Sequence, residues 1–197
     1  MADVLARVLD GPDATVGGGS ASALAGAMAA GLAGMVARLS MGRGLELSDA
    51  RYSGCAVEAD VLGAALLAGA GDDAEAYGLV KAAYGLPREA AAQAEARQAA
   101  IHDALIAAAF VPLDNARRAL RVREICRELG GRSNTSAASD LGVAVVLADA
   151  AVAGCLLNVE VNLEALPGSP AAARLRRGAE TVRISHARTS APLKECP

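Results

Sequence analysis

Residues 16–41 read VGGGSASALAGAMAAGLAGMVARLSM, and this stretch decides the fold class. Residues 21–37 contain no charged side chain, and small residues at Gly26, Ala30 and Gly34 recur on one face of a helix. A face of small residues lets another helix pack closely against it. The run is short for a membrane span and only weakly apolar, because alanine and glycine dominate it. We therefore expect a buried helix of a soluble bundle and no membrane span.

The rest of the chain also favours helices. Alanine, the best helix former, makes up about a quarter of the residues, and no long stretch alternates with a period of two. Glycine and proline breaks predict helices at 3–9, 20–41, 49–67, 72–84, 88–129, 139–166 and 170–188. The predicted class is all-α, in a single domain over residues 1–197.

Particular residues set the expected breaks and starts. Three residues, 69–71, include two glycines and should interrupt a helix. Pro112 should kink the longest helix, where an amide donor is lost. Ser136 or Ser139 should cap the helix that follows.

The composition limits the partners. Hydrophobic residues make up 53% of the chain but aromatic residues only 2%. Small side chains bury little area each, so we expect tight helix contacts and a large subunit interface. The net charge is −3 and the basic residues are scattered, which makes nucleic acid an unexpected partner.

The four cysteines, Cys55, Cys126, Cys155 and Cys196, lie far apart and form no C-x-x-C motif. We expect reduced structural thiols and no metal site, in keeping with the cytoplasm. The N-terminus also lacks the charged and apolar regions of a secretory signal.

A glycine-rich turn is the first candidate site. Gly17, Gly18 and Gly19 precede Ser20 and the apolar helix. Bare amides at the positive end of a helix suit an anion or a flat ring. The pattern is neither the dinucleotide fingerprint nor the phosphate loop, and no strand precedes it. Taken alone, the pattern favours a tight turn with a serine cap over a binding site.

A second candidate is the acidic segment near residue 73. Asp73, Tyr77 and Lys81 are spaced four apart, which places them on one face of a helix. A carboxylate beside a phenol can act as a general base or bind a cation. Taken alone, the segment favours an acidic helix start, which the helix dipole stabilises.

A third candidate includes Asn134 and Asp140, followed by Asn158 and Asn162. Asp140 and Asn158 share a helix face but lie about 27 Å apart along it, so one pocket of one subunit cannot hold both. Asn158 and Asn162 are expected to make structural hydrogen bonds between helices. Asp140 is either a site residue or a helix cap. The lone histidines, His102 and His186, suggest surface or interface groups and no catalytic triad.

Taken together, these stretches resemble the cyclodeaminase/cyclohydrolase family, over roughly residues 4–166. The segments that carry the resemblance are Gly17-Gly18-Gly19-Ser20, Gly42-Arg43, Asp73-Ala74-Glu75-Ala76-Tyr77, Ala83-Tyr84-Gly85-Leu86-Pro87-Arg88, Val111-Pro112-Leu113, Asn134 with Ser139-Asp140-Leu141, and Asn158-Val159-Glu160-Val161-Asn162-Leu163. Each motif is weak alone, but seven in the family's order are a specific signal.

The resemblance implies an antiparallel helical bundle with long, partly kinked helices, a homodimer, and a folate cleft near the subunit interface. It implies Asp73 and Asp140 as catalytic residues. The implied substrate-binding residues are Gly17, Gly18, Gly19, Ser20, Arg43, Tyr77 and Asn134. No metal and no cofactor besides the tetrahydrofolate substrate are expected.

The departures from the family pattern affect the reaction more than the fold. Val16 stands where the family usually has proline, and Arg43 where lysine is common. Arginine keeps the charge but cannot act as an acid. Asp114 stands where some cyclodeaminases have lysine.

We predict a methenyltetrahydrofolate cyclohydrolase, because the Tyr84-Gly85-Leu86-Pro87 motif is similar to stand-alone cyclohydrolases. A formiminotetrahydrofolate cyclodeaminase that releases ammonia, and a non-catalytic folate-binding relative, are the alternatives.

Overall fold

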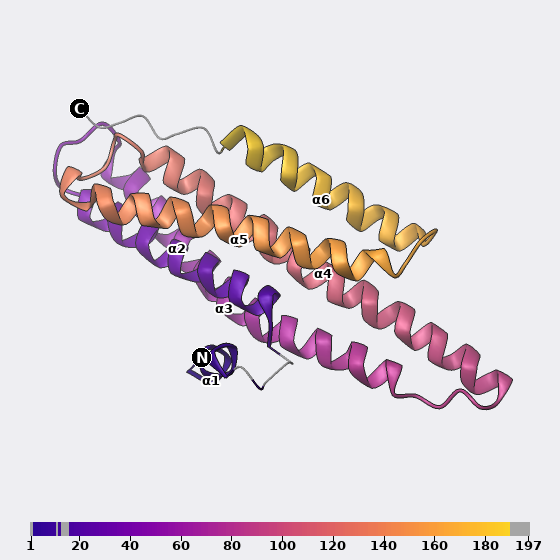
Figure 1. Cartoon of the computed structure of the whole chain (residues 1–197). Coiled ribbons are helices and arrows are strands. Elements are labelled where there is room, and N and C mark those ends of the chain that lie inside the picture. The colour runs from indigo at the N-terminus through magenta and orange to yellow at the C-terminus, as the bar shows by residue number, and fades with distance from the viewer. Residues whose placement is uncertain (1, 11, 13–15, 190–197) are drawn as a thin grey trace.

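The structure is a computed structural model that describes residues 2–10, 12 and 16–189. Within these residues the chain forms helices and no strand, which confirms the all-α prediction. The elements are α1 (Ala2–Leu9), α2 (Gly18–Ser40), α3 (Asp49–Tyr84), α4 (Ala91–Leu129), the 3₁₀ turn η1 (Thr135–Ala137), α5 (Ala138–Glu164) and α6 (Pro170–Thr189). Figure 1 shows α2 to α5 as an elongated antiparallel bundle, with α6 along one side and the short α1 apart from the main body.

Helix α2 is central because its small residues allow longer helices to approach it. It packs against α3, α4 and α5. Ala29 and Ala33 are fully buried. A Cβ on Gly26 would lie 3.2 Å from Leu66 Cδ1 and 3.3 Å from Ala151 Cβ. The small-residue face expected from the sequence is therefore where α3 and α5 meet α2.

Helix α3 runs unbroken from Asp49 to Tyr84, so the predicted interruption at residues 69–71 is wrong. Gly69 instead packs against Asn115 of α4. Asn115 Nδ2 donates to the Gly69 carbonyl at 3.1 Å, and a Cβ on Gly69 would lie only 2.1 Å from Asn115 Oδ1. The glycine thus permits close packing rather than a turn, and Asp73 lies inside a helix rather than at a helix start.

Helix α4 continues through Pro112 as one element. Proline has no N–H, so the carbonyl of Ala108, four residues earlier, lacks its usual helical donor. Asn162 of α5 supplies a replacement, with its Nδ2 2.9 Å from the Ala108 oxygen. The bond satisfies the carbonyl and ties α4 to α5. The expected kink at Pro112 stays a prediction.

The start of α5 is fixed by Asn134, and neither Ser136 nor Ser139 provides the predicted cap. Asn134 Oδ1 accepts from the Ser136 amide at 3.1 Å and begins η1, while α5 itself has no side-chain cap. Asn134 also donates from its amide to Ser40 Oγ at 2.9 Å and from Nδ2 to the Leu39 carbonyl at 3.3 Å. These bonds join the entry to α5 to the C-terminal end of α2.

Both histidines fasten α6 or its preceding loop to the bundle. His102 Nε2 lies 3.0 Å from Ser169 Oγ, just before α6. His186 Nε2 lies 2.8 Å from Asp149 Oδ1, which also accepts from the buried Arg123 at 3.0 Å. Each histidine therefore contacts a residue outside its own helix, in agreement with the expected interface role, and the two histidines belong to different parts of the bundle.

Three thiols lie inside the bundle. Cys55, Cys126 and Cys155 are free and buried, and burial raises the pKa of Cys126 and of Cys155 to about 12. Protonated, enclosed thiols behave as small apolar side chains, as predicted for structural cysteines. Cys196 lies outside the described residues.

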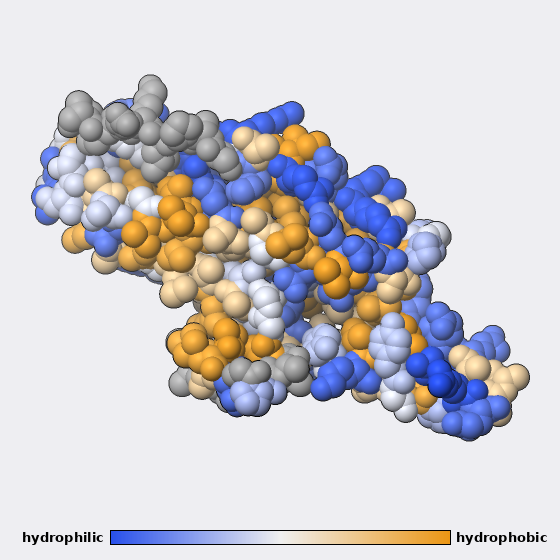
Figure 2. All heavy atoms as spheres, in the orientation of Figure 1, coloured by the Kyte–Doolittle hydropathy of each residue, from blue (hydrophilic) through white to orange (hydrophobic). Residues whose placement is uncertain are grey.

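The bundle exposes long apolar surfaces. In the described part of the chain, three helical segments are long and apolar enough to cross a membrane, by length and composition alone: Gly18–Ser40, Asp49–Tyr84 and Thr135–Glu164. The sequence drew attention only to the first. Figure 2 shows apolar side chains gathered along the course of α5 and over α1.

We predict that Gly69→Ala destabilises the protein, because the new methyl group would collide with Asn115. The expected loss is about 1–3 kcal/mol, in the range for overpacking a core. Chemical denaturation measures this loss as a shift of the unfolding midpoint, provided that the dependence of the unfolding free energy on denaturant concentration is the same in both proteins. Gly54→Ala, on the same helix with no atom within 4 Å of the new Cβ, is the control and should be neutral or slightly stabilising. Equal midpoints for the two variants would contradict the packing role.

Candidate active site

Residues from α2, α3, α4 and α5 surround a hollow of about 170 Å³ beside the N-terminal end of α2. The helices contribute differently: α2 gives its first turn, α3 and α5 their C-terminal thirds, and α4 its middle. The lining residues are Gly17, Gly18, Gly19, Asp73, Tyr77, Ala108, Asn158, Val161 and Asn162. The glycine turn and the acidic segment, which the sequence offered as separate candidates, thus share one pocket.

Asp73 is the carboxylate of this pocket, and Ser20 holds it in place. Ser20 Oγ lies 3.0 Å from Asp73 Oδ2 and 2.8 Å from the carbonyl of Ala70. The Ser20 amide also donates to the Asp73 carboxylate. Because amides in the first helical turn have no partner within their own helix, this carboxylate satisfies a free donor at the positive end of α2.

The triglycine turn is needed for the approach of Asp73. A Cβ on Gly19 would lie 2.3 Å from Asp73 Oδ1 and 2.6 Å from its Cγ. No side chain fits in that space unless the carboxylate moves. A Cβ on Gly18 would lie 3.5 Å from Asn158 Nδ2, an ordinary contact. Gly19 is therefore the glycine on which the carboxylate geometry depends.

The surroundings of Asp73 shift its acidity. Burial raises the pKa of the Asp73 carboxyl above its usual value, and the two hydrogen bonds from Ser20 oppose that rise. A carboxylate with a raised pKa is a stronger base than an exposed one, which suits proton transfer. Tyr77, 43% exposed, lies at the rim of the same pocket.

The sequence did not assign Asn158 and Asn162 to a site. They were expected to make structural hydrogen bonds, and they do: Asn158 Nδ2 donates to the Gly154 carbonyl at 2.8 Å and Asn162 Nδ2 to Ala108. Both nevertheless line the Asp73 pocket. Their spacing of four residues could have revealed this, because it places two amides on one face near the end of an apolar helix.

The remaining predicted site residues, Arg43, Asn134 and Asp140, lie at the opposite end of the bundle. Arg43 donates from Nε to the Leu39 carbonyl at 2.7 Å, the same carbonyl that accepts from Asn134. Asp140 lies in the first turn of α5. The 23 residues of α2 separate this group from the glycine turn by about 33 Å at 1.5 Å per residue. One chain therefore does not bring the two groups together.

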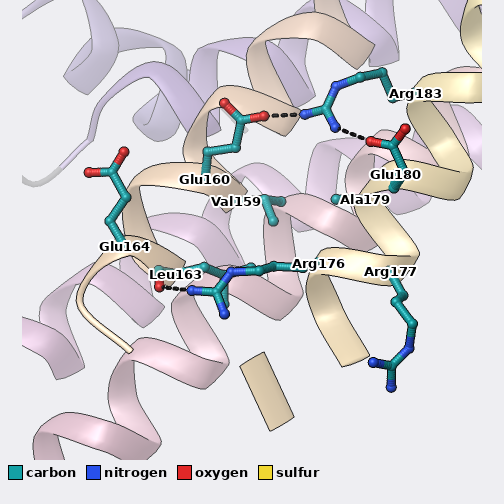
Figure 3. Close-up of a pocket in the computed structure, with 9 residues that line it drawn as sticks. All are labelled: Val159, Glu160, Leu163, Glu164, Arg176, Arg177, Ala179, Glu180 and Arg183. Carbon is teal, nitrogen blue, oxygen red and sulfur yellow. Dashed lines mark hydrogen bonds and ion pairs between the residues drawn. The ribbon is translucent and has the colours of Figure 1, made fainter. Parts of the chain in front are cut away.

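A larger hollow of about 530 Å³ lies between α5 and α6. Figure 3 shows that its charged side chains largely serve contacts within the chain. Arg183 pairs with both Glu160 and Glu180, and Arg176 donates to the Leu163 carbonyl. The hollow contains none of the predicted site residues, so we assign the chemistry to the smaller pocket.

No three His, Cys, Asp or Glu side chains gather closely enough to hold a metal ion in the part of the chain that the structure describes. The polar groups of the Asp73 pocket are one carboxylate, a phenol, two amides and bare backbone amides. Such a set can hold a polar ring and move a proton at an adjacent atom.

Residues 1–181 match the formiminotransferase-cyclodeaminase family. The chain belongs to this family. The resemblance read from the sequence motifs is thereby confirmed. The chain is 36% identical to the methenyltetrahydrofolate cyclohydrolase of Methylorubrum extorquens over 153 residues. The match covers 77% of this chain and 74% of that protein.

The fold is also shared with a solved member of this family. The crystal structure of formiminotetrahydrofolate cyclodeaminase from Thermotoga maritima has a TM-score of 0.78 and 25% sequence identity, and the match covers 89% of this chain and 84% of that one. Similarity thus extends to relatives named for two different reactions.

The pKa of Asp73 gives a prediction for Ser20→Ala. The variant loses a hydrogen bond that stabilises the ionised carboxylate, so the pKa of Asp73 should rise further. The carboxyl ¹³C chemical shift followed against pH measures this pKa, and the midpoint should move to higher pH. Ser22→Ala is the matched control, because Ser22 Oγ donates to the Gly18 carbonyl and not to Asp73. A lower midpoint in Ser20→Ala would contradict the assigned contact.

Proposed function

We propose that this chain is a methenyltetrahydrofolate cyclohydrolase, which hydrolyses 5,10-methenyltetrahydrofolate to 10-formyltetrahydrofolate in one-carbon metabolism. The observation that carries the proposal is the Asp73 pocket: a half-buried carboxylate of raised pKa, fixed by Ser20, beside a bare helix start. The similarity to the Methylorubrum extorquens cyclohydrolase supports the choice of reaction.

The geometry fits the chemistry of this hydrolysis. The methenyl carbon is bonded to two nitrogens and carries a delocalised positive charge, which the Asp73 carboxylate would stabilise. Asp73 would take a proton from the attacking water, a step commonly contributing about 10²–10⁴ in rate. The amides of Gly18 and Gly19, free in the first turn of α2, would donate to the new oxygen. Asp73 would return its proton to N5 as the bond between N5 and the carbon breaks, and loss of the hydroxyl proton to solvent then leaves the formyl group on N10.

The cyclodeaminase reaction is the second candidate, and the Thermotoga maritima relative favours it. It passes through the same kind of tetrahedral carbon between N5 and N10, but ammonia leaves instead of ring nitrogen. The same carboxylate and amides would serve both reactions. A non-catalytic folate-binding relative is the third possibility, supported only by Val16 and Arg43, which depart from the family pattern.

We propose further that the active form is a homodimer in which each pocket draws on both subunits. An exposed apolar strip runs along α5, with Val143 51%, Val146 67%, Leu157 63% and Val161 67% exposed. The strip follows the spacing of three and four residues that suits a second helix. Val161 belongs both to the strip and to the Asp73 pocket, so a partner docked there would border the pocket.

A two-fold arrangement would also bring the two ends together. Pairing two α5 strips antiparallel about their midpoint, near Val152, sets Val143 of the partner subunit beside Val161. Asp140 of the partner subunit then follows within one helical turn, about 5 Å along the axis. Arg43, whose Nη groups contact no partner among the described residues, would bind the glutamate tail of the substrate bidentately at the shared site.

The apolar faces would then serve this interface in the cytoplasm rather than a lipid bilayer. Charged contacts along the long helices support the choice. Glu58 of α3 pairs with Arg121 of α4, and Asp60 pairs with Arg38 of α2. Arg38, Glu58 and Asp60 lie within segments long enough to span a membrane, where ionised side chains are costly.

The absorbance of the substrate tests the reaction. Purified protein given 5,10-methenyltetrahydrofolate should accelerate the loss of its near-ultraviolet absorbance. Ammonia release from 5-formiminotetrahydrofolate would instead select the cyclodeaminase. Folate binding without turnover of either compound would select the non-catalytic relative.

Asp73→Asn is the matched variant for this assay. Turnover should fall at least about tenfold, because an amide cannot accept the proton. The thermal midpoint at neutral pH should not fall. A raised pKa means that ionising Asp73 destabilises the folded state as pH rises past the value in the unfolded chain, and asparagine removes that effect. Unchanged turnover would remove Asp73 from the mechanism.

Val146→Glu tests the dimer. Val146 is an exposed residue of the strip, so the variant should fold but be monomeric in sedimentation velocity. It should also lose at least about tenfold in turnover, since each pocket would lose its partner. Ile184→Glu, at a 45% exposed position on α6, is the control and should stay dimeric. A fully active wild-type monomer would contradict the shared site.

A further inference from the structure

Two side-chain amides in the Asp73 pocket are held in one orientation. Asn162 Nδ2 donates both its hydrogens to backbone oxygens, to Ala108 and to Asn158, each at 2.9 Å. An amide nitrogen has no further hydrogen to offer. Asn162 can therefore present only its oxygen, Oδ1, to a molecule in the pocket.

Asn158 is held similarly. Its Nδ2 donates to the Gly154 carbonyl at 2.8 Å and faces Gly18, where a Cβ would lie 3.5 Å away. One hydrogen of this nitrogen is thereby used within α5. Asn158 Oδ1 accepts no hydrogen bond from the residues that the structure describes, so the oxygen is the group that we take as offered to a ligand. Asn158 and Asn162 thus form a pair of acceptors one helical turn apart.

The Ala108 bond is a consequence of Pro112. In an ordinary helix the amide of residue 112 would occupy the Ala108 carbonyl. Proline removes that donor and leaves the carbonyl for the Asn162 amide. The orientation of Asn162 is accordingly set by a residue on a neighbouring helix that does not line the pocket.

We propose that Asn158 and Asn162 are specificity-determining residues that bind an edge of the substrate ring bearing adjacent N–H donors. A 2-amino-4-oxopyrimidine ring has such an edge, with its amino group beside a ring N–H. This assignment rests on the proposed folate substrate. It adds the identity of the residues that bind the pyrimidine ring of that substrate. Asp73 remains free for the reacting carbon, and the amides of Gly18 and Gly19 for oxygen.

Two stable quinazolines, 5,8-dideazafolate and its 2-desamino-2-methyl analogue, provide the test because they differ only at the amino group. Calorimetry on the wild-type protein should give a dissociation constant at least about tenfold lower for the amino compound, as expected when a buried acceptor loses its donor. Asn158→Ala and Asn162→Ala should each reduce this ratio to below about threefold, mainly by weakening the amino compound.

A rescue separates recognition from packing. Asn162→Ala leaves the Ala108 carbonyl without its donor and should lower the thermal midpoint. Adding Pro112→Ala returns a backbone N–H to that carbonyl, so the double variant should regain stability. It still lacks the Asn162 oxygen, so its selectivity for the amino compound should stay lost. Pro112→Ala alone keeps Asn162 and should keep most of the selectivity.

The outcomes are distinguishable. Wild-type protein that binds neither quinazoline would contradict the proposed folate substrate itself. Binding of both compounds with an unchanged ratio in the asparagine variants would overturn this inference alone. The inference would also be overturned if Asp73→Asn abolishes the preference for the amino compound while Asn158→Ala and the Asn162→Ala/Pro112→Ala double variant keep it. In that case the carboxylate of Asp73 would bind the amino edge of the ring.

Discussion

The contact between Ser20 and Asp73 is the interaction on which the site depends. It joins the first turn of α2 to the C-terminal third of α3, and it forms only because Gly19 leaves room for the carboxylate. The same contact settles two local problems. A free amide at the helix start gains an acceptor, and a half-buried carboxylate gains two donors. Packing, helix capping and acidity are therefore properties of one place in the fold.

The bundle around this contact is built from small side chains. Each alanine or glycine in α2 adds little buried area, but it lets neighbouring helices approach closely. The cost is a narrow core with much apolar surface outside, on α5 above all. An architecture of this kind favours association, and it explains why residues at both ends of one helix can belong to a single proposed site.

The sequence predicted the fold class and most helix limits, because alanine content and helical spacing are local properties. Only the family resemblance, read from the order of the motifs, implied one site for the glycine turn and Asp73. It failed where a residue serves a distant partner. Gly69 was taken as a break, although it accommodates Asn115 from another helix. Ser136 and Ser139 were taken as caps, although Asn134 had the better position. The pocket role of Asn158 and Asn162 depends on Ala108 across the bundle, which spacing alone does not reveal.

The proline in α4 also fixes how two helices may evolve. Because the carbonyl of Ala108 accepts its hydrogen bond from Asn162 of α5, the two helices are held at one longitudinal offset. Inserting or deleting a single residue between Leu129, where α4 ends, and Asn134 can be absorbed in the loop. A one-residue change between Asn134 and Asn162, by contrast, would rotate the asparagines about 100° away from both the carbonyl and the pocket. Length is therefore more tightly constrained in this segment than side-chain identity on its outer face.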